Sequence, residues 1–144
     1  MYYVNRKQIE MILGQIPDIR AGLQHAASAW DGSIITGLVQ ERCLHLAIEV
    51  VTDVGSYLID GFIMRDAGSY EDIISIIHEE KVLGDSGIYE VLIKLVSLRK
   101  PLVQDYYTWE RSTLHPLTHV LPQVLEQFAE EVRRYLDQEL GTGQ

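Results

Sequence analysis

An apolar spacing of three to four residues persists along almost the whole chain, and it is the strongest constraint on the fold. It is clearest from Ile34 to Phe62, a stretch that follows the turn residues Asp31, Gly32 and Ser33. At 1.5 Å per residue, a helix over this stretch would be roughly 40 Å long, about the length of a small domain. No stretch alternates apolar and polar residues well enough to indicate a strand. The pattern therefore predicts an all-α fold, a bundle of four to five antiparallel helices.

Turn and capping residues divide the chain into five predicted helices. Pro17 and Pro122 fall inside apolar patterns without disturbing their phase, so we expect a kink near each of them and no helix end. The first three predicted helices are residues 6–30 capped by Asn5, 34–62 capped by Ser33, and 70–80 capped by Ser69 with Asp72 in a capping-box position. The fourth is capped by Asp85 or Ser86 and ends near residue 99. The last starts at His115–Pro116.

The chain has 144 residues, which is the size of one domain. We assign residues 1–140 to this domain and expect residues 141–144 to form a frayed tail. The longest stretch free of charged residues, Ser112 to Leu125, is too short and too polar to cross a membrane. The only cysteine is Cys43, and the N-terminus is too polar for a signal peptide. These features predict a cytoplasmic protein that does not act at a membrane.

Acidic residues outnumber basic residues by 21 to 12, which gives a net charge of −9. This balance argues against a domain that holds nucleic acid by broad electrostatic attraction, because such domains are usually basic. An RNA site in this chain would have to be a small, local basic feature. The acidity also suits a protein partner.

Two groups of polar side chains could carry chemistry on helices. His115 and His119 are four residues apart, but two imidazoles are too few for a structural zinc site, so we predict no metal and no cofactor. His45, Glu49 and Asp53 form a row at helical spacing on the long second helix. This row is either a solvated stripe or a polar seam that lines a cleft or faces a second subunit.

The segment from Arg99 to Tyr107 concentrates polar chemistry at a helix end. It holds two cations, an amide, a carboxylate and two phenols. A simple structural interpretation is a helix terminus at which Arg99 and Lys100 interact with the helix dipole. The spacing Arg99, four residues, Gln104, one residue, Tyr106 suggests a second interpretation.

This spacing resembles the signature of HEPN domains of the HepT-like ribonuclease family, which is Arg, four residues, His, one residue, Tyr. Here the spacing is kept and Gln104 stands in place of His. The stretch CLHLAIEVVTDVGSYLIDGFIMRD and the following GSYEDI also resemble the YutE-like branch of that family. The resemblance covers most of the chain. It implies an all-α homodimer in which two copies of the motif face each other across a cleft.

The resemblance also implies roles for individual residues. Arg99, Gln104 and Tyr106 would form the catalytic site of a metal-independent endoribonuclease toxin, and Arg99 with Lys100 would bind RNA or a nucleotide. Gln104 has no accessible pKa, and the loss of a general acid–base group typically lowers a rate ~10²–10⁴-fold. The family's usual partner is a nucleotidyltransferase antitoxin, for which Tyr106 would be the AMP acceptor.

Two alternatives remain open. A non-catalytic HEPN module would keep the dimer and bind a nucleotide, an RNA or the nucleotidyltransferase. A purely structural helical dimer would have no site. If catalysis survives, another group must act as the base, and His45, Asp105 and His115 are the candidates.

Overall fold

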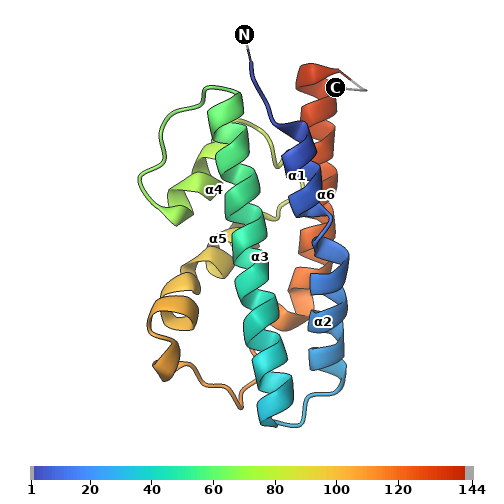
Figure 1. Cartoon of the computed structure of the whole chain (residues 1–144), viewed down its shortest axis with the longest axis vertical. Coiled ribbons are helices and arrows are strands. Elements are labelled where there is room, and N and C mark those ends of the chain that lie inside the picture. The colour runs from blue at the N-terminus through green and yellow to red at the C-terminus, as the bar shows by residue number, and fades with distance from the viewer. Residues whose placement is uncertain (1, 142–144) are drawn as a thin grey trace.

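The computed structural model describes residues 2–141, and in this range the chain forms helices and loops without a strand (Figure 1). The predicted all-α class is therefore confirmed. The elements are α1 (Arg6–Leu13), α2 (Ile16–Ser28), α3 (Ile34–Gly61), α4 (Tyr70–Glu79), α5 (Tyr89–Ser97), the π-helix η1 (Lys100–Gln104), the 3-10 helix η2 (Tyr106–Thr108) and α6 (Leu117–Leu140). Of the predicted tail, residues 142–144 lie outside the described range.

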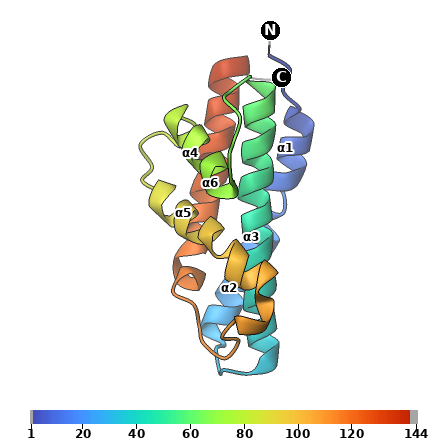
Figure 2. The same ribbon diagram turned by 90° about the vertical axis from the view of Figure 1, so that its left-hand side faces the viewer.

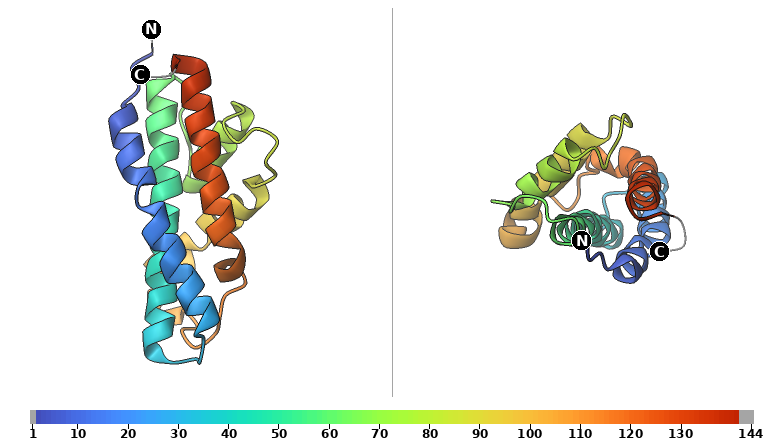
Figure 3. Two further views of the ribbon diagram at one scale, coloured as in Figure 1. Left: turned by 90° about the vertical axis from the view of Figure 1, so that its right-hand side faces the viewer. Right: turned by 90° about the horizontal axis from the view of Figure 1, so that it is seen from above.

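The long helix α3 is the centre of the bundle. It packs against α1 and α2 on one side and against α4 and α5 on the other, while α6 lies along α2 (Figures 1 and 3). Both α3 and α6 run antiparallel to the α1–α2 pair. The core is almost entirely aliphatic, with Leu44, Ile48 and Leu58 of α3 and Phe128 of α6 fully buried. This burial follows from the three-to-four-residue apolar spacing.

Three predicted N-caps are confirmed. The side chains of Asn5, Ser33 and Ser69 each accept a hydrogen bond from a backbone N–H in the first turn of α1, α3 and α4. Such caps satisfy donors that the helix itself cannot satisfy. They also fix where α3 and α4 begin, and the start of α4 matters for the site described below.

The predicted kink at Pro17 is wrong, because the helix ends before this residue and a new one begins. Helix α1 ends at Leu13, and α2 starts at Ile16 with Pro17 in its first turn. A proline in the first turn loses no helical hydrogen bond, because the N–H groups there have no partner within the helix. The buried face continues across the break, so α1 and α2 occupy one line of the bundle (Figure 3).

Two other boundaries differ from the prediction. Asp72 does not complete a capping box with Ser69, because its carboxylate accepts from both terminal nitrogens of Arg65 and from the Gly68 N–H. Helix α5 begins after Ile88 and has no side-chain cap, whereas Asp85 or Ser86 was predicted. The Ser86 hydroxyl instead donates to the Leu83 carbonyl, which closes the turn before α5.

Helix α6 begins one residue later than predicted. Pro116 precedes its first residue, Leu117, and Pro122 lies inside the helix. Across residues 2–141, no helix is both long enough and apolar enough to cross a bilayer.

Candidate functional site

The motif segment leaves the end of α5 as a π-turn. Helix α5 stops at Ser97, and residues Lys100–Gln104 form η1, closed by a 2.8 Å hydrogen bond from the Asp105 N–H to the Lys100 carbonyl. Pro101 has no N–H to continue the α-helical ladder, so the turn can widen there. In a π-helix the hydrogen bonds join residues five apart. Arg99 directly precedes η1, and Gln104 is its last residue. Figure 2 shows this segment projecting beside α3.

Arg99 is held by an aromatic ring. Its guanidinium carbon lies 4.1 Å from the centroid of the Tyr70 ring, which is a cation–π contact. Its Nε atom is buried and has no hydrogen-bond partner, and no carboxylate among the described residues forms an ion pair with it. The guanidinium is therefore positioned without being neutralised, which leaves its charge available to an anion.

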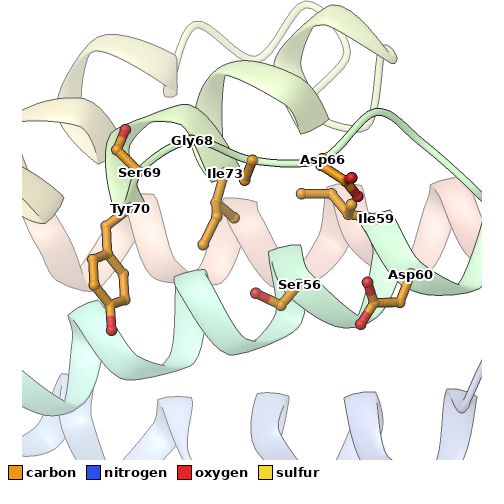
Figure 4. Close-up of a pocket in the computed structure, with 9 residues that line it drawn as sticks. Ser56, Ile59, Asp60, Asp66, Gly68, Ser69, Tyr70 and Ile73 are labelled. Carbon is orange, nitrogen blue, oxygen red and sulfur yellow. The ribbon is translucent and has the colours of Figure 1, made fainter.

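Tyr70 connects Arg99 to a groove between α3 and α4. Tyr70 is the first residue of α4, directly after the N-cap Ser69. The groove has a volume of about 510 Å³, with Tyr70 at one end and the carboxylates of Asp60 and Asp66 at the other (Figure 4). The groove thus starts beside a cation and ends at two carboxylates.

The remaining motif residues are accessible. The Tyr106 side chain is 63% exposed, and the neighbouring Tyr107 ring packs edge-on against it at 5.7 Å between centroids. Gln104 is exposed at the end of η1. The Lys100 ammonium lies 3.5 Å from the Asp105 carboxylate. Lys100 therefore has a carboxylate partner in Asp105, whereas Arg99 has no carboxylate partner among the described residues.

The row of His45, Glu49 and Asp53 lies on the outer face of α3. His45 Nε2 is 3.3 Å from a Glu49 carboxylate oxygen. Partial burial raises the pKa of Asp53, and the nearby charge of Glu49 raises this pKa further. Among residues 2–141, no hydrogen bond or ion pair joins this row to the motif segment. Both predicted interpretations of the row, a solvated stripe and a seam, remain predictions.

His115, a candidate base, is engaged at the start of α6. Its Nδ1 atom accepts a 3.1 Å hydrogen bond from the Leu117 N–H, and its ring stacks on Trp109 at 5.8 Å between centroids. Burial lowers the pKa of His115, so the neutral ring is favoured. Neither His115 nor His119 joins a cluster of three or more possible metal ligands in the described part of the chain.

One residue that we did not single out from the sequence organises this region. Gln40 of α3 is fully buried, and its side chain binds the segment between η2 and α6. Its Nε2 donates to the Thr113 carbonyl at 3.1 Å, and its Oε1 accepts from the His115 N–H at 2.8 Å and from the Thr118 hydroxyl at 2.7 Å. The available sequence signal was a glutamine in the buried phase of an apolar helix.

Comparisons with known proteins identify the family. A family model described as "Ribonuclease HepT-like" matches residues 9–132. The chain therefore belongs to the HepT-like ribonuclease family. A Bacillus subtilis (strain 168) protein named "Putative RNase YutE" is 40% identical over 141 residues, which cover 98% of this chain and 96% of that protein. A solved structure of YutE from Bacillus subtilis, described there as a cytosolic protein of unknown function, matches with a TM-score of 0.86 at 39% identity and covers 100% of this chain and 99% of that one.

The family resemblance seen in the sequence is thus confirmed. The comparisons establish the family, and the assignment of Arg99, Gln104 and Tyr106 to its motif stays a prediction from the spacing. Arg99 precedes η1, Gln104 ends η1 and Tyr106 begins η2; η1 packs against α3, and Arg99 contacts Tyr70 of α4.

Proposed function

We propose that the chain is the toxin component of a toxin–antitoxin pair, a metal-independent endoribonuclease with its site at the cleft of a homodimer. The observation that carries this proposal is the Arg99 guanidinium, which is held on Tyr70 at 4.1 Å and has no carboxylate partner among the described residues. A positioned cation of this kind stabilises the negative charge that develops on a phosphorane. Family membership supplies the substrate class, which is RNA.

The proposed reaction uses the ribose 2′-hydroxyl as the nucleophile. Its oxygen bonds to the adjacent phosphorus, the bond from phosphorus to the 5′-oxygen breaks, and the products carry a 2′,3′-cyclic phosphate and a 5′-hydroxyl. The 2′-proton goes to a base, and the leaving oxygen receives a proton. Arg99 binds the non-bridging phosphate oxygens, with Lys100 as a second cation, and the Gln104 amide donates a hydrogen bond to the same phosphate.

Proton transfer is the weak step of this reaction. Gln104 can neither accept nor release the proton, so we expect catalysis ~10²–10⁴-fold slower than with histidine at this position. Asp105 is paired with Lys100, and His115 Nδ1 is occupied by the Leu117 N–H. His45, on the exposed face of α3, is therefore the side chain that we assign to the cleft as a base, with Glu49 beside it.

Two copies of the chain would complete the site. In a two-fold dimer the same patch of both subunits meets at the axis, which brings two Arg99 and two Tyr106 side chains together. The row of His45, Glu49 and Asp53 would line this cleft. An intersubunit cleft also concentrates two cations locally in a protein that is acidic overall.

The proposed partner is a nucleotidyltransferase antitoxin that transfers AMP to Tyr106. The phenol oxygen would attack the α-phosphorus of ATP, a new oxygen–phosphorus bond would form, pyrophosphate would leave and the phenolic proton would go to solvent. The 63% exposure of Tyr106 supports this role. Because YutE is described as cytosolic, we also propose a cytoplasmic location for this chain.

Gln104 favours a second candidate function. A HEPN module without catalysis would use the same dimer and the same Arg99 to bind a nucleotide, an RNA or the nucleotidyltransferase. Gln104 keeps the hydrogen-bonding capacity of the site and loses its acid–base capacity.

The deciding experiment measures cleavage of a mixed-sequence RNA in EDTA by the wild-type protein, by Arg99→Ala and by Arg133→Ala. Arg133 lies on α6 and pairs with Glu10, so its removal makes the same change in charge away from the site. We expect cleavage by the wild type and by Arg133→Ala, and none by Arg99→Ala. RNA binding that depends on Arg99, without cleavage, would replace the ribonuclease with the binding module. Equal RNA cleavage and equal RNA binding by all three proteins would refute both functions of the Arg99 site.

A further inference from the structure

A small apolar cavity lies beside the motif segment. It has a volume of about 260 Å³ and is lined by Pro101 of η1, Thr108 of η2, and Trp109 and His115 from the loop that follows. Sites for drug-sized ligands usually measure ~300–1,000 Å³. This cavity is smaller, so its size suits one planar ring system. Pro101 is two residues from Arg99 in the chain, so the cavity and the proposed phosphate site share the motif segment.

The walls of the cavity include aromatic and proline rings. The Trp109 and His115 rings stack with an interplanar angle of 21° and centroids 5.8 Å apart. Pro101 and Pro116 add two proline rings to the lining. Aromatic side chains of this kind bind bases of single-stranded nucleic acids by stacking. Glu110 lines the cavity and neither lysine nor arginine does, so a phosphate or carboxylate has no countercharge there.

The lining is almost entirely apolar, although two of its rings carry an N–H group. The Trp109 Nε1 atom is buried and has no hydrogen-bond partner, although a buried indole N–H usually finds an acceptor. His115 accepts at Nδ1 from the Leu117 N–H, so in the neutral ring the proton is on Nε2. Burial lowers the pKa of His115 and favours this neutral form. The lining residues thus offer two stacked rings, while the Trp109 N–H is covered.

We propose that this cavity binds one nucleobase of the RNA strand whose phosphate is bound at Arg99. A nucleobase has two apolar faces that stack on aromatic rings, and its size matches the volume of the cavity. The identity of the strand as RNA rests on the proposed function, whereas the ability to take a base rests on the cavity alone.

Tryptophan fluorescence tests this proposal directly. The chain has two tryptophans, Trp30 and Trp109, so Trp30→Phe leaves Trp109 as the only tryptophan. This variant is titrated with three probes, which are AMP, a 2′-O-methyl RNA oligonucleotide that resists cleavage, and ribose 5-phosphate, which has no base. We expect saturable quenching by AMP and by the oligonucleotide, and none by ribose 5-phosphate.

A filled cavity and a matched control make the test specific. Thr113 is exposed and lines the cavity, whereas the neighbouring Ser112 is exposed and does not. In the Trp30→Phe background, Thr113→Phe should lower the affinity for the oligonucleotide about five- to a hundredfold, which corresponds to the stacking of one base. Ser112→Phe should leave this affinity unchanged. Circular dichroism is used to check that both variants keep their helix content.

The results separate this inference from the proposed function. Cleavage that depends on Arg99, without base-dependent quenching of Trp109, would overturn the inference and leave the ribonuclease intact. Quenching by AMP alone would overturn the assignment to an RNA strand. Quenching by the oligonucleotide in a protein that cleaves no RNA would support the base site and refute the ribonuclease.

Discussion

The replacement Gln40→Met tests how the loop around the candidate site is anchored. Gln40 is fully buried in α3 and makes three hydrogen bonds, to the Thr113 carbonyl, the His115 N–H and the Thr118 hydroxyl. Methionine has a similar size and cannot make these hydrogen bonds, so the change removes polar contacts without opening a large cavity.

The structure sets the magnitude of the effect. A neutral hydrogen bond contributes about 1 kcal/mol net, so three of them contribute about 3 kcal/mol. The Thr118 hydroxyl is buried as well, so its loss of an acceptor adds to the destabilisation. For a protein near this size, 1 kcal/mol shifts Tm by ~2–4 °C, so we expect Tm to fall by about 6–12 °C.

Urea unfolding followed by circular dichroism measures the free energy of unfolding. Gln123→Met on the exposed face of α6 is the matched control, and it should stay within about 0.5 kcal/mol of the wild type. Thr118→Val removes one of the three bonds and should cost about 1 kcal/mol. If Gln40→Met also stays within about 0.5 kcal/mol of the wild type, the three bonds do not anchor the loop and this reasoning is wrong.

Three further predictions concern the motif and its surroundings. Tyr70→Leu should lower kcat for RNA cleavage about fivefold and leave KM nearly unchanged, whereas Tyr70→Phe keeps the ring and should retain wild-type kcat; equal rates for both variants would exclude a positioning role. The hydrogen bonds from Arg65 lower the pKa of Asp72 to about 2, below its usual 3.8. The pair therefore stabilises the fold above pH 3.8, and this contribution is lost as the pH falls from 3.8 to 2. Acid unfolding of Asp72→Asn should lack that part of the pH dependence. Gln104→His restores the motif histidine and should raise the cleavage rate ~10²–10⁴-fold, with a pH optimum near neutrality; an unchanged rate would show that proton transfer does not limit the reaction.

The helix faces could be predicted from the sequence because burial follows a simple period. The caps Asn5, Ser33 and Ser69 were also predictable, since each combines a short polar side chain with the start of an apolar pattern. Pro17 was misjudged because a proline is equally compatible with a kink and with the first turn of a new helix, and the choice depends on residues 14 and 15. Local patterns thus predict which face of a helix is buried better than they predict where the helix ends.

The site was predictable only in part. The spacing of Arg99, Gln104 and Tyr106 is visible in the chain, but the partner of Arg99 is a tyrosine on another helix, and its identity depends on how α4 packs. Gln40 had a local signal, since it occupies the buried phase of α3, yet its partners lie more than seventy residues away. Tertiary contacts of this kind have no periodic signature in a single sequence.

A π-turn separates the two ends of the motif spacing. In an α-helix of 3.6 residues per turn, residues five apart point about 140° away from each other. Arg99 precedes η1 and Gln104 ends it, and the wider turn, closed by the bond from the Asp105 N–H to the Lys100 carbonyl, reduces this angle. Pro101 makes the wider turn possible, because it lacks the N–H that would continue α5. The same proline also lines the cavity assigned to the nucleobase. One helix-breaking residue therefore lies both in the widened turn between Arg99 and Gln104 and in the wall of the proposed base site.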